Sequence, residues 1–360
     1  MQQRVRLLLP FRSKGTHFMK VFTRDYRMNH ICSPVFGEYY NGLKPCVLDI
    51  EATGLDPSRC KVILMGLLTE TESGVKVTQF LAENHYEEYK VLQATVDFLK
   101  DEGIDYLITF NGLRYDIPFI NTRLESNFMD DKLQIYDFDL YRFLRKCSNL
   151  PQKLSSLSQA SCESYFGIAS NRQDTISGRE SVALFDEYSI SGNSTVEKII
   201  LTHNREDVLQ LYQLMQLASR NEYADILDTD FHSAIAKYGF PCAHENATVT
   251  KPSFTVRPTI NASRKELRIC GDQLTAPISA AYFPDMDNIV TALFNKTSSS
   301  FEITIPVQSH ADSYFVDIKK LGLSQTAIDA FSEDPEFVND YLILNPRTVN
   351  LLSRIILEKF

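Results

Sequence analysis

The chain has 360 residues, of which 44% are hydrophobic and 23% charged, and its formal net charge is −9. This length suits two domains, and the composition excludes a disordered or fibrous protein. The N-terminal apolar run Leu7–Leu9 is too short for a signal peptide, and no stretch is long enough for a membrane span. Seven cysteines without a CxxC pair favour reduced thiols. A cytoplasmic protein without membrane contact is therefore expected.

Residues 1–44 are predicted to form an irregular, basic N-terminal arm, because they carry eight Lys and Arg against Asp25 and Glu38. The rest of the chain is correspondingly acidic. Negative charge opposes general binding of nucleic acid, since phosphates favour a positive surface. An acidic site that binds cations would add to the same imbalance, so the charge alone does not exclude a nucleic-acid enzyme.

The next segment, residues 45–230, is predicted to be one α/β domain. Aliphatic and β-branched runs indicate strands at 46–51, 62–68, 75–82, Tyr106–Phe110 and Ile135–Leu140. Helices are expected at 89–99, Asp116–Ser126, 139–147, 154–166, 179–188 and 195–220. Three early strands followed by alternating strands and helices predict a mixed sheet flanked by helices.

The pattern changes after about Asp230. Strands are expected at Lys251–Arg257, Lys265–Cys270, Ile289–Phe294, Phe301–Val307 and Tyr314–Ile318, with a hairpin tip at Thr297–Ser300 and a final helix at Val349–Phe360. Residues 231–360 are therefore predicted to form a smaller C-terminal α+β domain. It contains no recognisable catalytic cluster, and its role stays open.

Two acids, Asp49 and Glu51, stand at the end of the apolar strand that begins at Cys46. Side chains at positions i and i+2 of a strand point the same way. Two carboxylates held together at the end of a buried strand repel each other unless a hard divalent cation neutralises them. The alternative is that both acids only cap the turn that follows at Gly54 and Asp56.

Three further residues are candidates for the same site. Asp116 follows a short apolar strand and opens a helix, where a carboxylate is also a good structural cap. His203 and Asp207 are four apart and share one helix face, which continues into the apolar positions Leu211 and Leu214. The pair is therefore expected to look into the domain.

Four carboxylates and one imidazole suit a two-metal site that acts on a phosphodiester. In such sites the two ions lie about 3.5–4 Å apart. Asp49 is expected to bridge, joined by Glu51 and Asp207 at one ion and by Asp116 at the other. Oxygen ligands favour Mg²⁺ or Mn²⁺ over zinc. His203 could orient or deprotonate the attacking water, because histidine titrates near neutral pH.

The combination Asp49-x-Glu51, Asn111-x-x-x-Tyr115-Asp116-x-Pro118 and His203-x-x-x-Asp207 resembles the DEDD 3′-5′ exonuclease superfamily, which has an RNase H-like fold. The chain is most similar to the bacterial YprB-like ribonuclease H-like domain, and the loop with Asn171-Arg172-Gln173-Asp174 adds to that likeness. The resemblance covers residues 45–220. It implies a hydrolase that removes nucleotides from 3′ ends of DNA or RNA.

The resemblance also implies contacts with single-stranded 3′ ends. Asn111 and Tyr115 would hold the terminal nucleotide by hydrogen bonding and aromatic packing. Arg142 and Arg145, with Lys146, could meet backbone phosphates, although such residues are often only a solvated helix face. One departure concerns the last motif: the three-residue gap usually goes with tyrosine at the position of His203, and histidine usually goes with a four-residue gap.

Two other functions remain open at this level. The chain could be a catalytically silent nucleic-acid-binding module on a nuclease fold, although a silent site has no physical reason to keep four crowded acids. It could also bind a protein partner, of unknown identity, through residues 231–360. The sequence does not distinguish DNA from RNA, because that difference is a 2′-hydroxyl contact.

Overall fold

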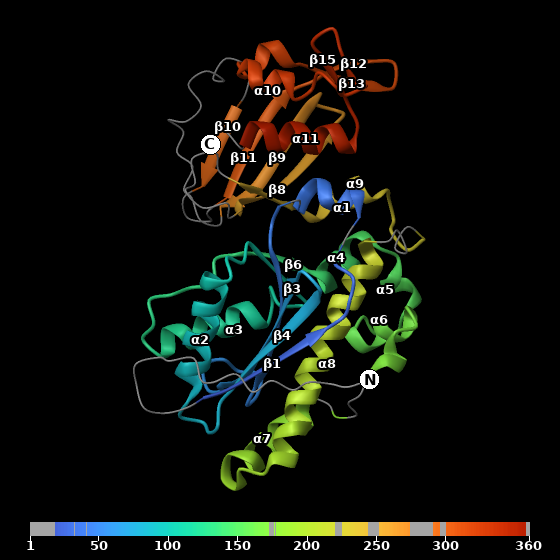
Figure 1. Cartoon of the computed structure of the whole chain (residues 1–360). Coiled ribbons are helices and arrows are strands. Elements are labelled where there is room, and N and C mark those ends of the chain that lie inside the picture. The colour runs from blue at the N-terminus through green and yellow to red at the C-terminus, as the bar shows by residue number, and fades with distance from the viewer. Residues whose placement is uncertain are drawn as a thin grey trace.

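The computed structural model describes residues 19–31, 33–40, 42–172, 176, 178–219, 225–243, 252–273, 291–295 and 300–357. Its elements form an N-terminal unit around one sheet and a C-terminal unit around two more, with helices α1 (Pro34–Tyr40) and α9 (Phe231–Tyr238) between them (Figure 1). No helix in the described part of the chain combines the length and apolarity that crossing a membrane requires.

The sheet of the N-terminal unit has six strands in the order β1-β4-β3-β2-β5-β6. The strands β1 to β4 pair antiparallel, whereas β2, β5 and β6 are parallel. The predicted mixed sheet is confirmed. The strands are β1 (Lys20–Tyr26), β2 (Pro45–Ala52), β3 (Val62–Thr71), β4 (Gly74–Leu81), β5 (Tyr106–Thr109) and β6 (Tyr136–Asp139).

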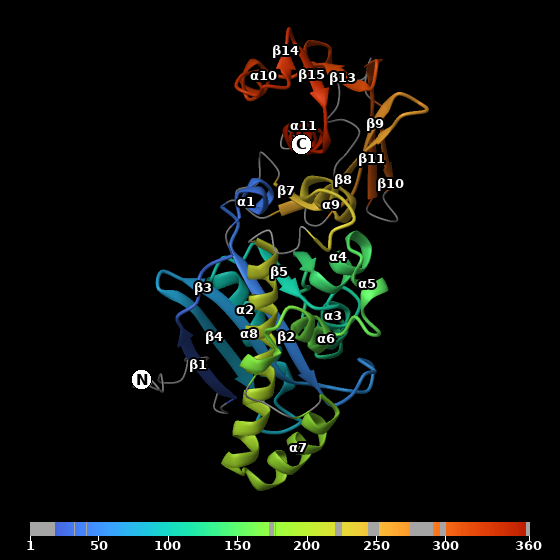
Figure 2. The same ribbon diagram turned by 90° about the vertical axis from the view of Figure 1, so that its right-hand side faces the viewer.

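Helices cover both faces of this sheet (Figure 2). They are α2 (Glu88–Asp101), α3 (Asp116–Ser126), α4 (Leu140–Cys147), α5 (Leu150–Lys153), α6 (Gln159–Tyr165), α7 (Gly178–Ser191) and α8 (Ser194–Ser219), with a short 3₁₀ turn at Ala169–Asn171. Successive residues of β2 pack into opposite cores: Leu48 lies with Leu92 of α2, and Val47 lies with Val208 and Leu211 of α8. The face of β2 that carries Val47 therefore looks toward α8.

Two local expectations were wrong. Part of the N-terminal segment is regular, because Lys20–Tyr26 pairs with β4 and Pro34–Tyr40 is helical; residues 1–18 lie outside the described part. The helix expected at 154–166 begins only at Gln159. Ser158 is its N-cap, and its side chain accepts the backbone N–H of Ser161. This cap fixes the start of the helix at that residue.

The C-terminal unit is α+β, as predicted. A five-stranded antiparallel sheet has the order β10-β11-β9-β8-β7, and a four-stranded one has the order β12-β13-β15-β14. Of the expected hairpin tip at Thr297–Ser300, only Ser300 is described. The elements are β7 (Phe240–Ala243), β8 (Pro252–Asn261), β9 (Glu266–Gln273), β10 (Thr291–Asn295), β11 (Ser300–Pro306), β12 (Gln308–His310), β13 (Ser313–Asp317), η3 (Ile318–Leu321), α10 (Gln325–Asp329), β14 (Phe337–Val338), β15 (Tyr341–Leu344) and α11 (Pro346–Leu357).

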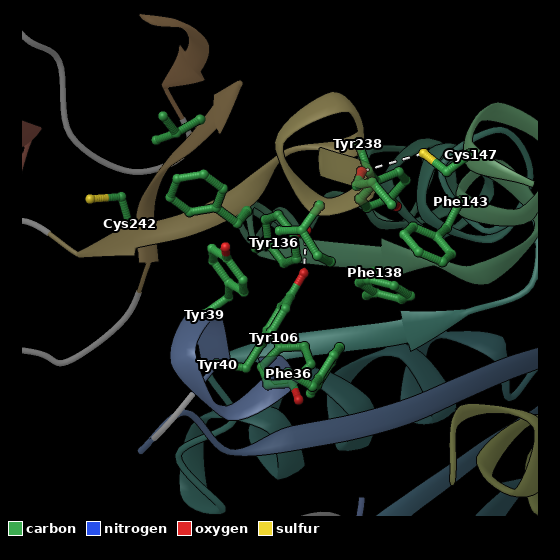
Figure 3. Close-up of a cluster of buried hydrophobic side chains, with 14 of the residues drawn as sticks. Phe36, Tyr39, Tyr40, Tyr106, Tyr136, Phe138, Phe143, Cys147, Tyr238 and Cys242 are labelled. Carbon is green, nitrogen blue, oxygen red and sulfur yellow. Dashed lines mark hydrogen bonds between the residues drawn. The ribbon is translucent and has the colours of Figure 1, made fainter. Parts of the chain in front are cut away.

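A cluster of buried aromatic residues joins the two units (Figure 3). The Tyr40 and Tyr136 hydroxyls are hydrogen-bonded at 2.9 Å, and that of Tyr136 donates to the Gly239 carbonyl at 2.8 Å. The Tyr238 hydroxyl accepts the backbone N–H of Asp139 at 2.7 Å. Buried polar groups are costly without such partners. The interface is therefore a shared core with satisfied hydroxyls rather than a loose contact.

Candidate metal-binding active site

The two acids of β2 lie on the strand face that looks toward α8. Asp49 pairs in register with Gly66 of β3, and Glu51 pairs with Leu64. A register shift follows between Glu51 and Ala52, where the strand ends. Asp49 is half-buried and Glu51 is 6% exposed. The two carboxylates therefore project side by side into a largely dry region.

Asp116 opens α3, directly after the turn that follows β5. Its carboxylate accepts the backbone N–H of Ile50, which lies between the two acids of β2 in the sequence. Asp116 is buried, and its charge acts on both Asp49 and Glu51. Its position is thus more than a helix cap, because it brings a third carboxylate to the end of β2.

His203 and Asp207 face the β2 acids from α8. The Nε2 atom of His203 lies 3.6 Å from Oε1 of Glu51 and 3.6 Å from Oδ2 of Asp207. One ligand atom from each of these three residues lies within 4.8 Å of the others, which is close enough for a shared metal ion. Glu51, His203 and Asp207 therefore come together from β2 and α8, and the charges of Asp49 and Asp116 act on this group.

The electrostatics of this group are those of crowded acids. Burial, followed by the negative charges of Asp207, Asp116 and Glu51, holds the pKa of Asp49 well above its ordinary value. Burial raises the pKa of Glu51 to about 7, against the opposite influence of His203. Burial likewise raises the pKa of Asp116 to about 7. Burial and crowding thus disfavour the charged forms of these carboxylates, and a bound cation would favour them.

Asn204 fixes the orientation of Asp49 and was not identified from the sequence. Its Nδ2 donates to Oδ2 of Asp49 at 2.9 Å, and its Oδ1 accepts Nε2 of Gln79 at 2.8 Å. The Asn204 side chain is fully buried against Gly66. A Cβ atom added to Gly66 would lie 2.8 Å from the Cγ atom of Asn204. A glycine inside an otherwise apolar strand often marks such a close approach, so Gly66 was the available signal.

We expect Gly66→Ala to destabilise the protein by about 1–3 kcal/mol, because the methyl group would push against a buried side chain. It should also weaken binding of Mn²⁺, since Asn204 could no longer hold Asp49. Denaturant unfolding and calorimetry would measure the two effects. Gly37→Ala is the control, because nothing lies within 4 Å of a Cβ added there. In an Asn204→Ala background the cost of Gly66→Ala should shrink; an unchanged cost would exclude this contact as the cause.

Arg172 is a second residue whose role was missed, although its loop was noted in the sequence. Its Nη2 donates to Oδ1 of Asp207, and its Nη1 donates to both oxygens of Glu163 at 3.0 and 3.2 Å. Gln159 on α6 also bonds Glu163 and the carbonyl of Asp207. Oδ1 of Asp207 is thereby turned to α6, while Oδ2 faces His203. Nothing in the spacing of these residues along the chain signals the pairing.

The two residues expected to hold the terminal nucleotide, Asn111 and Tyr115, lie in the turn that precedes Asp116. Asn111 has φ of 68°, a left-handed conformation that asparagine tolerates, and its N–H donates to Oδ1 of Asp139 at 2.8 Å. Tyr115 is half-buried, and its hydroxyl donates to the Gly54 carbonyl at 3.2 Å. The turn after β2 and the turn before α3 are thus joined beside the site.

Arg142 and Arg145 lie on the exposed face of α4, outside the carboxylate group itself. The backbone N–H of Arg142 donates to Asp139, which also caps this helix. The guanidinium of Arg145 bonds the hydroxyl of Tyr141 at 3.1 Å. Asp139 therefore has a structural role, holding both the start of α4 and the turn at Asn111.

Comparison with known protein families finds a match over part of the chain. Residues 46–219 match the model of the RNase_H superfamily. With the sheet order above, the N-terminal unit is RNase H-like, and the match supports a nuclease-type function for this segment. Curated proteins give no match. A solved structure with partial similarity is the family B DNA polymerase from the hyperthermophilic archaeon Pyrobaculum calidifontis, with 16% identity and a TM-score of 0.39 over 54% of this chain and 25% of the polymerase chain.

Proposed function

We propose that the chain is a metal-dependent 3′-5′ exonuclease of the DEDD type, most similar to the YprB-like subfamily, that hydrolyses phosphodiester bonds of DNA or RNA. One observation carries the proposal: Glu51 of β2 and His203 and Asp207 of α8 lie close enough to share an ion, and the charges of Asp49 and Asp116 act on this group. We further propose residues 45–230 as the nuclease domain and 231–360 as a separate C-terminal domain.

The donor set fits two Mg²⁺ or Mn²⁺ ions. All four acids offer oxygen atoms, which such ions prefer. The raised pKa values of Glu51 and Asp116 indicate that burial disfavours their charged forms, which a bound divalent ion would stabilise. Asp49 would serve both ions, with Glu51 and Asp207 at one and Asp116 at the other. Bound metal would supply activation of a water molecule and stabilisation of the leaving oxygen.

The remaining roles belong to side chains around the carboxylates. His203 lies beside Glu51 and Asp207, where it can take a proton from the attacking water. Asn111 and Tyr115 would hold the terminal nucleotide at the rim of the site, and Arg142 and Arg145 would contact phosphates further along. The expected substrate is therefore a single strand whose 3′ end enters the site.

Incubation of the full chain with 5′-labelled single-stranded DNA and RNA tests the proposal directly. Products that shorten progressively from the 3′ end with Mg²⁺ or Mn²⁺, and not with EDTA, are the expected result. Binding without degradation in every metal would instead identify a silent nucleic-acid-binding module. Neither binding nor degradation would exclude both and favour a partner-binding role for residues 231–360.

Metal should also change how stability depends on pH. The folded-state pKa values of Glu51 and Asp116 lie near 7, above their ordinary values, so the folded protein binds protons more tightly than the unfolded chain. Without metal, stability should therefore fall as pH rises from about 4.5 to 7. Thermal melts in EDTA should show this loss, and Mn²⁺ should reverse it at pH 7 to 8. Identical pH profiles with and without Mn²⁺ would contradict the assignment of these acids.

A further inference from the structure

Basic residues gather where the two units meet. Helices α4 and α9 lie side by side there (Figure 2), and the Cys147 thiol donates to the Ala234 carbonyl. The Nζ atom of Lys146 on α4 donates to the carbonyl of Lys237 on α9. Both lysines are exposed. The ammonium group of Lys146 at the end of α4 therefore lies beside α9, which carries the second exposed lysine, Lys237.

A second cation of the C-terminal unit joins them. The Nε atom of Arg257 on β8 donates to the Tyr238 carbonyl at 3.0 Å, directly after Lys237. The pKa of Lys146 is lowered by partial burial and then by the positive charges of Arg257, Arg142 and Lys237, so each of these three cations lies within electrostatic reach of Lys146. We call Arg142, Lys146, Lys237 and Arg257 the basic junction. It reverses the charge locally in a chain whose net charge is −9.

The basic junction begins at the edge of the candidate site. Asp139 accepts the N–H groups of both Asn111 and Arg142, at 2.8 and 3.1 Å, so the first cation stands next to the turn expected to hold the terminal nucleotide. Lys146 follows Arg142 at i+4 and shares its helix face. The cations thus lead from the site, along α4, onto the C-terminal unit.

Acidic neighbours offset part of this charge, because Arg142 acts on Asp137 and Asp139, but the carboxylates near the other cations are weak partners. Asp272 pairs with Arg257 at 2.9 Å, but that carboxylate is 53% exposed. Exposed ion pairs contribute little free energy and are screened by salt. Asp228 acts on nearby Cys147, yet Lys237 and Lys146 act there more strongly and with the opposite sign. A phosphate could therefore displace or bypass these weak partners.

We propose that the basic junction binds the phosphate backbone of the single strand whose 3′ end enters the carboxylate site, so that the C-terminal unit forms part of the nucleic-acid interface. The proposal rests on the nuclease function above and extends it to residues 231–360. The geometry favours a flexible polyanion, because the cations follow one another from the Asn111 turn instead of forming a single compact pocket. Binding of this kind depends steeply on salt.

The test is fluorescence anisotropy of the full chain with a labelled oligothymidine of about 20 nucleotides in EDTA, over a salt series. Lys237→Gln/Arg257→Gln removes two cations of the basic junction. Lys319→Gln/Lys320→Gln removes the same charge from an exposed position on η3 and serves as control. The junction variant should bind several-fold more weakly, and its salt slope should fall by about 0.7 for each phosphate that it no longer neutralises. The control should match the wild type.

Three results would overturn the proposal, and they have different meanings. Equal binding by the junction and control variants, in a protein that still degrades DNA with Mg²⁺, would refute the basic junction alone. Failure of the wild type both to bind and to degrade would refute the nuclease function, and this inference with it. Binding of polyaspartate as tight as that of oligothymidine would assign the surface to an acidic protein partner. Melting curves of each variant verify that it is folded.

Discussion

Asp49→Asn is expected to abolish degradation and, at the same time, to make the metal-free protein more stable. Asp49 is the acid on which the charges of Asp207, Asp116 and Glu51 all act, so an uncharged amide relieves repulsion at neutral pH. A gain of about 1 kcal/mol corresponds to roughly 2–4 °C in Tm for a unit of this size. Activity should fall further than the roughly 10–100-fold typical of residues that only support a metal ligand.

Melting curves in EDTA and the labelled-strand assay measure these two effects, and calorimetry measures the loss of Mn²⁺ binding expected with them. Asp25→Asn is a suitable control, because Asp25 is an exposed acid on β1 of the same sheet. Its substitution should change neither activity nor Mn²⁺ binding. Survival of degradation in Asp49→Asn, or unchanged Mn²⁺ binding, would remove Asp49 from the metal site.

His203→Ala should slow turnover by about 10²–10⁴-fold if the imidazole acts as general base. Its Nε2 atom is equally far, 3.6 Å, from an oxygen of Glu51 and from one of Asp207, so the same atom could instead be a ligand. Mn²⁺ affinity separates the two roles. If His203 is a general base, its removal should leave Mn²⁺ affinity nearly unchanged. If it is a metal ligand, its removal should weaken Mn²⁺ affinity along with turnover.

The matched control for this variant is His310→Ala, which removes an exposed imidazole from β12 in the third sheet. It should behave as the wild type in both assays. If His203→Ala degrades the labelled strand at the wild-type rate, the histidine has neither role, and the water must be activated by another group.

The convergence of the acids could be predicted because each stands at a place that local rules define. Asp49 ends an apolar strand, Asp116 opens a helix, and Asp207 lies one turn before a buried stripe. Such positions meet at one edge of a mixed sheet. Asn204 and Arg172 could not be found this way, because their partners are 155 and 35 residues distant and only tertiary packing selects them.

The same distinction explains the errors in the fold. The strand Lys20–Tyr26 is short and carries charges, and it is a strand because β4 offers a partner at the sheet edge. The intrinsic preference of a sequence for the strand conformation has less influence than such pairing. The helix expected at 154–166 was too long because serine caps compete with the helix interior, and at Ser158 the cap prevailed.

The bond from Asn350 of α11 to the Tyr39 hydroxyl joins residues 311 apart, at 2.6 Å. During synthesis, α1 must therefore wait for 311 further residues before this partner arrives. Meanwhile Phe36, Tyr39 and Tyr40, all buried in the finished protein, have no complete cover. Apolar surface left open in this way invites aggregation, so the nascent chain is a natural client for chaperones.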